Sequence, residues 1–92
     1  MINTREKTQE EVAVLEQKKN LNEIILHNDD VNTFDFVIDA LIDVCEHTLI
    51  QAEQCTILVH YKGKASVKHG EYDTLKPVCT KLLDMGLSAE IV

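Results

Sequence analysis

Three small polar residues, Asn28, Asp29 and Asp30, interrupt an apolar stretch of the 92-residue chain within LHNDDVNTFDF, residues 26–36. Such side chains bond to neighbouring backbone amides, so on their own they predict a turn that starts a helix. Their oxygens can also accept hydrogen bonds from a ligand. A peptide α-ammonium group brings donors and no acceptor, so a site for it needs amide or carboxylate oxygens, or a neutral imidazole nitrogen, beside an apolar pocket. The tripeptide by itself leaves both interpretations open.

A metal ion is the second ligand that these polar residues could hold. His27, Asp29, Asp30 and His60 could converge on one ion. A helical HxxxH motif or a pair of CxxC motifs would fix the geometry of a metal site, and the chain has neither. We therefore expect no metal site, and we expect no cofactor.

Catalysis would need a nucleophile, for which the cysteines are the candidates. Cys45, Cys55 and Cys79 are odd in number and ten and twenty-four residues apart, which fits neither a CxxC site nor a paired disulfide framework. Each lies among apolar residues at helical spacing, so we expect reduced thiols in the core. The chain also lacks GxGxxG, GxxxxGK[ST], HExxH and GxSxG motifs. We therefore expect a protein that is not an enzyme.

The excess of acidic over basic residues limits the kinds of partner that the chain is expected to bind. It carries 16 acidic and 9 basic residues, for a net charge of −7, which argues against binding nucleic-acid phosphates and favours cationic or polar peptides. Residues 22–55 hold eight acids and no Lys or Arg, whereas five lysines fall between Lys62 and Lys81. No segment offers the roughly 20 apolar residues of a membrane span, and the N-terminus lacks an apolar signal region. We expect a cytoplasmic monomer that binds neither nucleic acid nor membrane.

The elements that must position these residues follow from the apolar pattern. LNEIILH, residues 21–27, predicts a short strand that ends at the polar cluster. Asn32 or Thr33 then caps a helix with Asp35 in its first turn. The apolar residues of this helix recur at steps of three and four, which predicts one buried face. That face comprises Phe34, Val37, Ile38, Leu41, Val44 and Cys45.

A second, shorter helix and a hairpin are expected next. Thr48 and Gln51 form a capping box for a helix that runs through about Cys55. The β-branched stretch TILVHYKG, residues 56–63, predicts a strand. The tight turn Lys-Gly-Lys then predicts a hairpin that returns through residues 65–69.

The last helix is expected to begin at a capping Asp73, to carry Pro77 in or just beyond its first turn, and to stop at Gly86. A final extended piece, AEIV, is expected to rejoin the sheet.

These elements predict one α+β core domain, residues 22–92, with a small antiparallel sheet of about three strands and three helices packed on one face. Residues 1–21 are mostly polar and predict a flexible N-terminal extension with at most a marginal helix.

Two sequence motifs, taken together, indicate a protein family more specifically than either does alone. The first is HNDD followed by Phe34-x-Phe36-Val37 at the start of a helix, and the second is AEQCTILVHYKGKA, residues 52–65. Together they resemble the ClpS family of adaptor proteins, which deliver substrates to the Hsp100 unfoldases of Clp proteases. The resemblance extends from about Asn22 to Val92.

The resemblance implies an adaptor for N-degrons, which are substrates whose exposed N-terminal residue is bulky and apolar: Phe, Leu, Tyr or Trp. Carried over residue by residue, Asn28 and His60 hold the α-amino group, Asp29 supports the first peptide unit, and Asp30 shapes the loop. The implied partner is a Clp-family AAA+ unfoldase, engaged by the N-terminal extension. The implied side-chain pocket comprises Asn32, Phe34, Val37, Thr56, Val59 and Ala89.

The chain departs from the family pattern at three places. Asn32-Thr33-Phe34 stands where the family commonly has Thr-Pro-Met, so an aromatic residue gates the pocket. Ser88-Ala89-Glu90 replaces a Pro-Leu-Leu that often contributes apolar wall. Val31 and Val78 replace an aromatic residue and a lysine that often contact the unfoldase. The alternative function, from a different class, is a non-catalytic interaction module that modulates the unfoldase without recognising an N-terminal residue.

Overall fold

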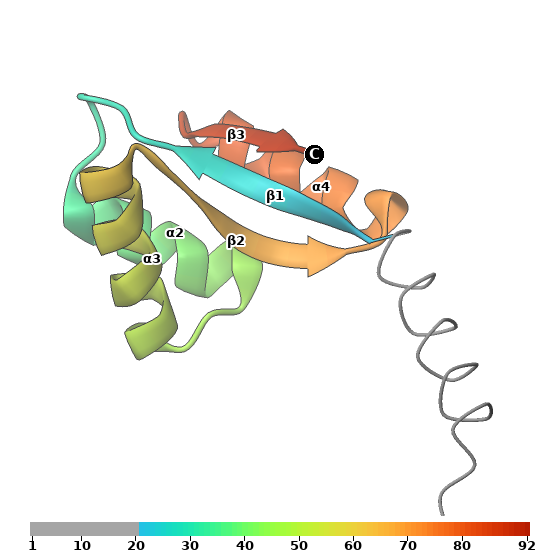
Figure 1. Ribbon diagram of the computed structural model, residues 1–92, viewed down its shortest axis with the longest axis horizontal. Helices are drawn as coiled ribbons and strands as arrows, with labels where there is room; N and C mark the ends of the chain where they lie inside the picture. The colour runs from blue at the N-terminus through green and yellow to red at the C-terminus, as the bar shows by residue number, and fades with distance from the viewer. Residues whose placement is uncertain (1–20) are drawn as a thin grey trace, which may run out of the picture.

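In the computed structural model, which describes residues 21–92, a three-stranded sheet is combined with three helices (Figure 1). Both strand pairings are antiparallel, and β1 lies between β2 and β3. This arrangement confirms the predicted α+β class and the predicted number of strands and helices. The element order is β1 (Asn22–His27), α2 (Phe34–Cys45), α3 (Leu49–Lys62), β2 (Lys64–Gly70), α4 (Tyr72–Asp84) and β3 (Ser88–Ile91).

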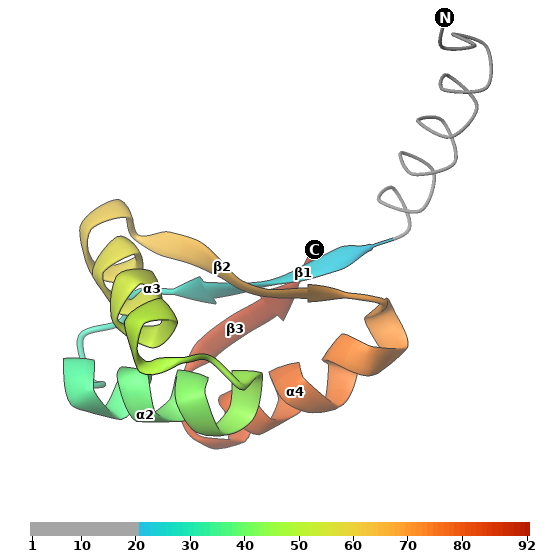
Figure 2. The ribbon, with the colours of Figure 1, turned by 90° about the horizontal axis from the view of Figure 1, so that it is seen from below.

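The core lies between the sheet and its helices. Along the central strand β1, Ile24 and Leu26 are fully buried while their neighbours are partly exposed, the alternation expected when one face of a sheet is covered. Figure 2 shows α2 and α4 along that face, with α3 at one end of the sheet, where it contacts α2 and β2. The other buried apolar residues are Val37, Ala40, Leu41, Cys45, Ala52, Val59, Val67, Leu75, Cys79, Leu82 and Leu87.

The predicted strand over residues 56–63 is wrong, because most of this stretch forms the second half of α3. Ala52, Thr56 and Val59 are buried at helical spacing, and burial of that face outweighs the β-branched local preference. Gly63 adopts φ 87°, the left-handed conformation that ends a helix, so it is not the turn of a hairpin. The segment that follows, β2, pairs with β1 instead of with residues 56–63.

The predicted cap of the last helix is also wrong. Glu71 occupies the N-cap position without a side-chain hydrogen bond, and Asp73 lies in the first turn of α4. Gly86 follows the helix in the left-handed conformation, as its predicted role as a stop requires.

Two predicted helix starts are confirmed. The Thr48 hydroxyl accepts from the Gln51 backbone N–H at 3.2 Å, and the Gln51 side chain accepts from the Thr48 N–H at 2.9 Å, so the capping box of α3 is complete. The Thr33 hydroxyl accepts from the Phe36 N–H at 3.1 Å and caps α2. These side-chain bonds define where α2 and α3 begin.

The N-terminal extension predicted for residues 1–21 lies, apart from Leu21, outside the described residues. None of the three described helices has the length and apolar content needed to cross a membrane.

Candidate functional site

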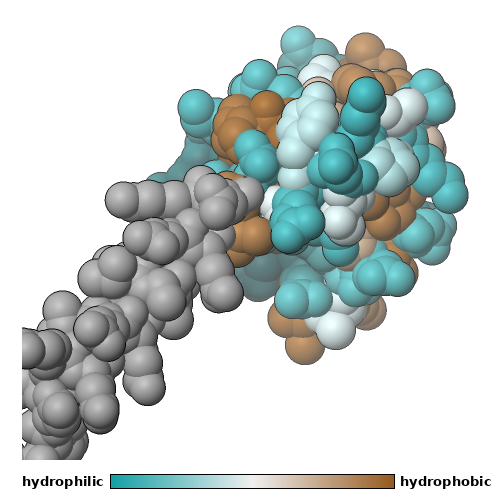
Figure 3. Space-filling model, turned by 90° about the vertical axis from the view of Figure 1, so that its right-hand side faces the viewer, coloured by the Kyte–Doolittle hydropathy of each residue, from teal (hydrophilic) through white to brown (hydrophobic). Residues whose placement is uncertain are grey.

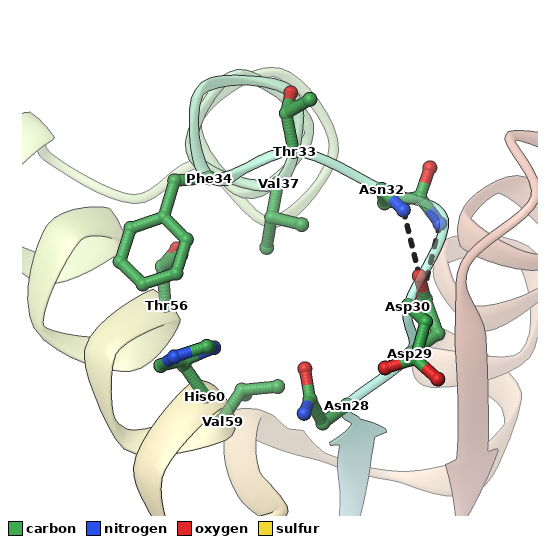
Figure 4. Close-up of a pocket in the computed structure, with 10 residues that line it drawn as sticks. All are labelled: Asn28, Asp29, Asp30, Asn32, Thr33, Phe34, Val37, Thr56, Val59 and His60. Atoms are coloured by element: carbon green, nitrogen blue, oxygen red, sulfur yellow. Dashed lines mark hydrogen bonds between the residues drawn. The ribbon is translucent and has the colours of Figure 1, made fainter.

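A pocket of about 310 Å³ lies between the loop that follows β1, the start of α2 and the second half of α3 (Figure 4). Nine of the ten residues predicted for the site line it, and Thr33 lines it as well. Asn28, Val59 and His60 lie along one side of the pocket, and Thr33, Phe34 and Val37 lie along the other. The full lining is Asn28, Asp29, Asp30, Asn32, Thr33, Phe34, Val37, Thr56, Val59 and His60.

One backbone hydrogen bond brings the two halves of the site together. The Asn28 N–H donates to the Gly63 carbonyl at 2.9 Å, which ties the end of β1 to the end of α3. His60 lies in the last turn of α3, just before Gly63. Asn28 and His60, more than thirty residues apart in sequence, therefore line one side of the same pocket.

The loop is shaped by Asp29 and Asn32. The Asp29 carboxylate accepts from the backbone N–H groups of Val31 and Asn32, at 2.9 and 2.7 Å, and from the Asn32 side-chain amide at 2.9 Å. These bonds, those from Asn32 foremost, hold the pKa of the Asp29 carboxyl below its usual value, so the group is ionised at neutral pH. The Asn32 amide also donates to the Gly86 carbonyl at 3.0 Å and so anchors the loop to the turn before β3.

The structure gives Asp29 the loop-shaping contacts that the sequence analysis assigned to Asp30. Within residues 21–92 the exposed Asp30 side chain forms no hydrogen bond that would hold the loop. A carboxylate offers about four acceptor positions, and Asp29 uses three of them inside the loop. One acceptor position therefore remains for a ligand.

Buried side chains form the inner wall of the pocket. Val37 from α2 and Val59 from α3 are both buried. Thr56 is the only polar residue buried in the part of the chain that the structure describes, and its hydroxyl donates to the Ala52 carbonyl at 2.7 Å. Because that bond satisfies the hydroxyl within its own helix, the wall suits an apolar group.

Phe34 and His60 meet at the mouth of the pocket. Their ring centroids are 5.0 Å apart in an edge-to-face arrangement, and the His60 ring makes a similar contact with Tyr61 at 5.1 Å. Phe34 remains 42% exposed. Within the described residues, neither the His60 ring nitrogens nor the Asn28 side-chain amide forms a hydrogen bond, so both remain available to a ligand.

Ala89 is the predicted pocket residue that the structure does not bring to this site. It lies in β3 opposite Leu26 and borders a different hollow, between α4 and β3. Thr33, which does line the pocket, was predicted only as a helix cap. Its position at the N-cap of α2, three residues after the polar cluster, is the signal that could have placed it at the rim.

The cysteines are poorly suited to nucleophilic chemistry. All three are free thiols, with Cys45 and Cys79 buried and Cys55 half-buried. Burial raises the pKa of the Cys45 thiol to about 11 and also raises the pKa values of the Cys55 and Cys79 thiols. Between residues 21 and 92, no group of three or more His, Cys, Asp or Glu side chains is placed to hold a metal ion.

Comparison with known proteins gives a family match over most of the chain. Residues 17–90 match the family described as ATP-dependent Clp protease adaptor protein ClpS. The chain is 40% identical over 57 residues to the ClpS adapter of Acetivibrio thermocellus, covering 62% of this chain and 58% of that one. It is 38% identical over 56 residues to the ClpS adapter of Campylobacter jejuni subsp. jejuni, covering 61% and 56%. The matched stretch thus spans somewhat over half the length of these relatives.

A solved structure shares the fold. Agrobacterium tumefaciens ClpS2 bound to L-phenylalaninamide aligns with a TM-score of 0.76 over 79% of this chain and 95% of that one, at 23% sequence identity. At this identity the likeness shows a shared fold.

Proposed function

Because the chain belongs to the ClpS family, we propose that it is a non-catalytic adaptor that binds proteins by a bulky apolar N-terminal residue and delivers them to a Clp-family AAA+ unfoldase. One observation supports this most directly. The Asn28 amide and the His60 ring, neither of which forms a side-chain hydrogen bond within residues 21–92, lie on one side of a pocket whose inner wall is apolar.

The polar side of the site matches a free α-amino group. The side-chain amide oxygen of Asn28 and the unprotonated ring nitrogen of a neutral His60 are both acceptors, and the α-ammonium has three N–H donors and no acceptor. The Asp29 carboxylate adds negative charge and one unused acceptor position next to them. Each charge-assisted hydrogen bond contributes about 1.5 to 3 kcal/mol before ordering costs.

The apolar wall matches the side chain of the same residue. Burying a Leu or Phe side chain there contributes about 1.5 to 3 kcal/mol. The Agrobacterium tumefaciens relative has L-phenylalaninamide bound, and this molecule combines a free α-amine with an aromatic side chain and carries no carboxylate, like the first residue of a peptide. Neither the amine nor the side chain alone supplies enough free energy for tight binding, so we expect both to be required.

Fluorescence anisotropy with short labelled peptides tests the proposal. Peptides that begin with Phe, Leu, Tyr or Trp should bind, and the same peptides with an acetylated N-terminus should bind at least tenfold more weakly, since acetylation removes the charge and two donors. Equal affinity for free and acetylated peptides would rule the proposal out.

A second function is favoured by the contacts within the loop. Asp29 and Asn32 hold the loop without any ligand, as they would if it only shaped a surface for the unfoldase. The double variant Asn28→Ala/His60→Ala separates the two functions, because it leaves those contacts intact. If substrate delivery to the unfoldase survives in this variant, the chain acts as an interaction module without N-terminal recognition. Loss of delivery with retained unfoldase binding supports the adaptor.

A further inference from the structure

Helix α3 carries apolar side chains on its outer face as well as on its buried face. Ile50, Ile57 and Tyr61 recur at steps of seven and four, which places them on one side of the helix. Their exposed fractions are 73%, 40% and 78%. A surface helix normally presents polar residues outward, so this face of α3 lacks a partner among the described residues.

This face lies at the end of the molecule that carries the pocket. Figure 1 shows α3 at one end of the sheet, the same end as the start of α2 and the loop that follows β1. The opposite end, seen in Figure 3, shows hydrophobic residues interspersed among hydrophilic ones. The Tyr61 ring contacts the His60 ring, which lines the pocket, and Ile57 lies one helical turn before Tyr61. The apolar face is therefore continuous with the mouth of the proposed site.

The two sides of the mouth differ in charge. On α3, Glu53 and Lys62 are the only residues with a formal charge at neutral pH, in a chain with a net charge of −7. On α2, Asp35, Asp39 and Asp43 are exposed. An apolar side chain that packed on the α2 side would displace water from exposed carboxylates, which is costly, whereas the outer face of α3 offers it uncharged apolar surface.

Distance limits which part of a bound peptide can reach this face. An extended peptide advances about 3.3 to 3.6 Å per residue. The Tyr61 ring is 5.1 Å from the His60 ring, so it is within reach of the second and third residues when the first residue occupies the pocket. Ile50 precedes Tyr61 by eleven residues, which is roughly 16 Å along the helix axis, and is beyond their reach.

We propose that Tyr61 and Ile57 form a shelf that binds an apolar side chain at the second or third residue of the substrate. This inference rests on the proposed function, since it requires an N-terminal residue in the pocket. It makes recognition depend on more than the first residue: among substrates that begin with the same residue, those with an aromatic or aliphatic residue next are preferred.

Competition binding with two matched peptides tests the shelf. Both begin with Phe, and one carries Leu and Tyr at positions two and three where the other carries Gly and Ser. The wild-type chain should bind the apolar peptide roughly threefold to tenfold more tightly, the gain expected from partly burying one side chain. Tyr61→Ala should abolish this preference and leave the affinity for the Gly-Ser peptide unchanged. Ile50→Ala is the control, because it removes a similarly exposed apolar residue from the same helix face and should keep the preference.

The outcomes separate failure of the shelf from failure of the proposed function. If acetylation abolishes binding but the wild-type chain does not distinguish the two peptides, the shelf is wrong and the N-terminal site stands. If Tyr61→Ala weakens both peptides equally, Tyr61 supports the His60 ring and forms no shelf. If Tyr61→Ala keeps the preference but loses unfoldase binding, the face belongs to the unfoldase and the shelf is again wrong. If neither peptide binds, both proposals fail.

Discussion

In the proposed complex, His60 can accept a hydrogen bond from the substrate amine only while one of its ring nitrogens is unprotonated. An imidazolium has two donors and no acceptor, and it also repels an ammonium group. Asp29 differs, because the hydrogen bonds from Asn32 and Val31 hold the pKa of its carboxyl below the usual value, so it remains an ionised acceptor at mildly acidic pH. The two residues can therefore be distinguished by pH.

We expect peptide affinity to be lower at pH 5 than at pH 7, because an imidazolium at His60 would offer the amine no acceptor. The α-amino group of the peptide is already protonated over most of this range, so its titration does not cause the loss. Anisotropy titrations at constant ionic strength measure the effect. His60→Gln provides the control, since its amide oxygen remains an acceptor at every pH and its weaker binding should be nearly pH-independent. An unchanged wild-type affinity would exclude His60 as an acceptor.

A stability prediction concerns Asp29. Replacing it by Asn removes the charge from three hydrogen bonds and turns part of the acceptor into a donor, which should lower the free energy of unfolding by about 1 to 2 kcal/mol at pH 7. Because the folded-state pKa is lowered, the stabilisation is present above the usual carboxyl pKa and is lost as pH falls through the folded value. Urea unfolding should therefore show a smaller difference between the two proteins near pH 3. The matched control is Asp30→Asn, whose stability should equal that of the wild type.

At the scale of elements, the strand β1 and the helix α2 were predictable, because the apolar residues of each follow a single spacing. The polar cluster marks the end of β1, and the capping Thr33 marks the start of α2. The stretch over residues 56–62 was not predictable. Ile57 and Tyr61 are apolar on the outer face of α3, so the helical alternation of apolar and polar residues is missing, and the β-branched residues favoured a strand. These exposed apolar residues, which obscured the helical pattern in the sequence, are the same ones that we infer to bind substrate. The prediction from the local apolar pattern thus failed at a helix face whose apolar residues are not needed for folding.

Gly63 is the residue on which the end of α3 depends. Its φ of 87° is accessible to glycine at no cost, and a Cβ at this position would meet no atom within 4 Å. Gly63→Ala should therefore cost about 1 kcal/mol through backbone strain alone, seen as a drop in Tm of roughly 4 to 8 °C. Gly70→Ala is the control, because a Cβ there makes only ordinary contact with Leu75 at 3.5 Å and φ lies outside the left-handed region. Equal Tm values for the two variants would contradict the assignment.

For the whole molecule, the acidic segment of residues 22–55 covers β1, α2 and the first half of α3, whereas the five lysines begin at the last residue of α3 and continue in β2 and α4. Nine of the ten residues predicted for the site line one pocket, and they could be named in advance because they fall in two short motifs whose combination resembles a known family. Ala89 was not predictable, because its position depends on how β3 pairs with β1. Opposite Leu26, it packs between the sheet and α4, and no local pattern specifies that pairing.

The hydrogen bond from the Asn28 N–H to the Gly63 carbonyl couples binding to folding. It joins the end of the first strand to the end of the third element, so the pocket exists only in the folded chain and the unfolded chain has no comparable affinity. By mass action, a peptide at one hundred times its dissociation constant should then stabilise the entire domain by about 2.7 kcal/mol. Thermal unfolding would report that gain for a Phe-initiated peptide and not for its acetylated form. Any N-terminal sequence can thus be ranked by the unfolding temperature alone, without a label or an unfoldase.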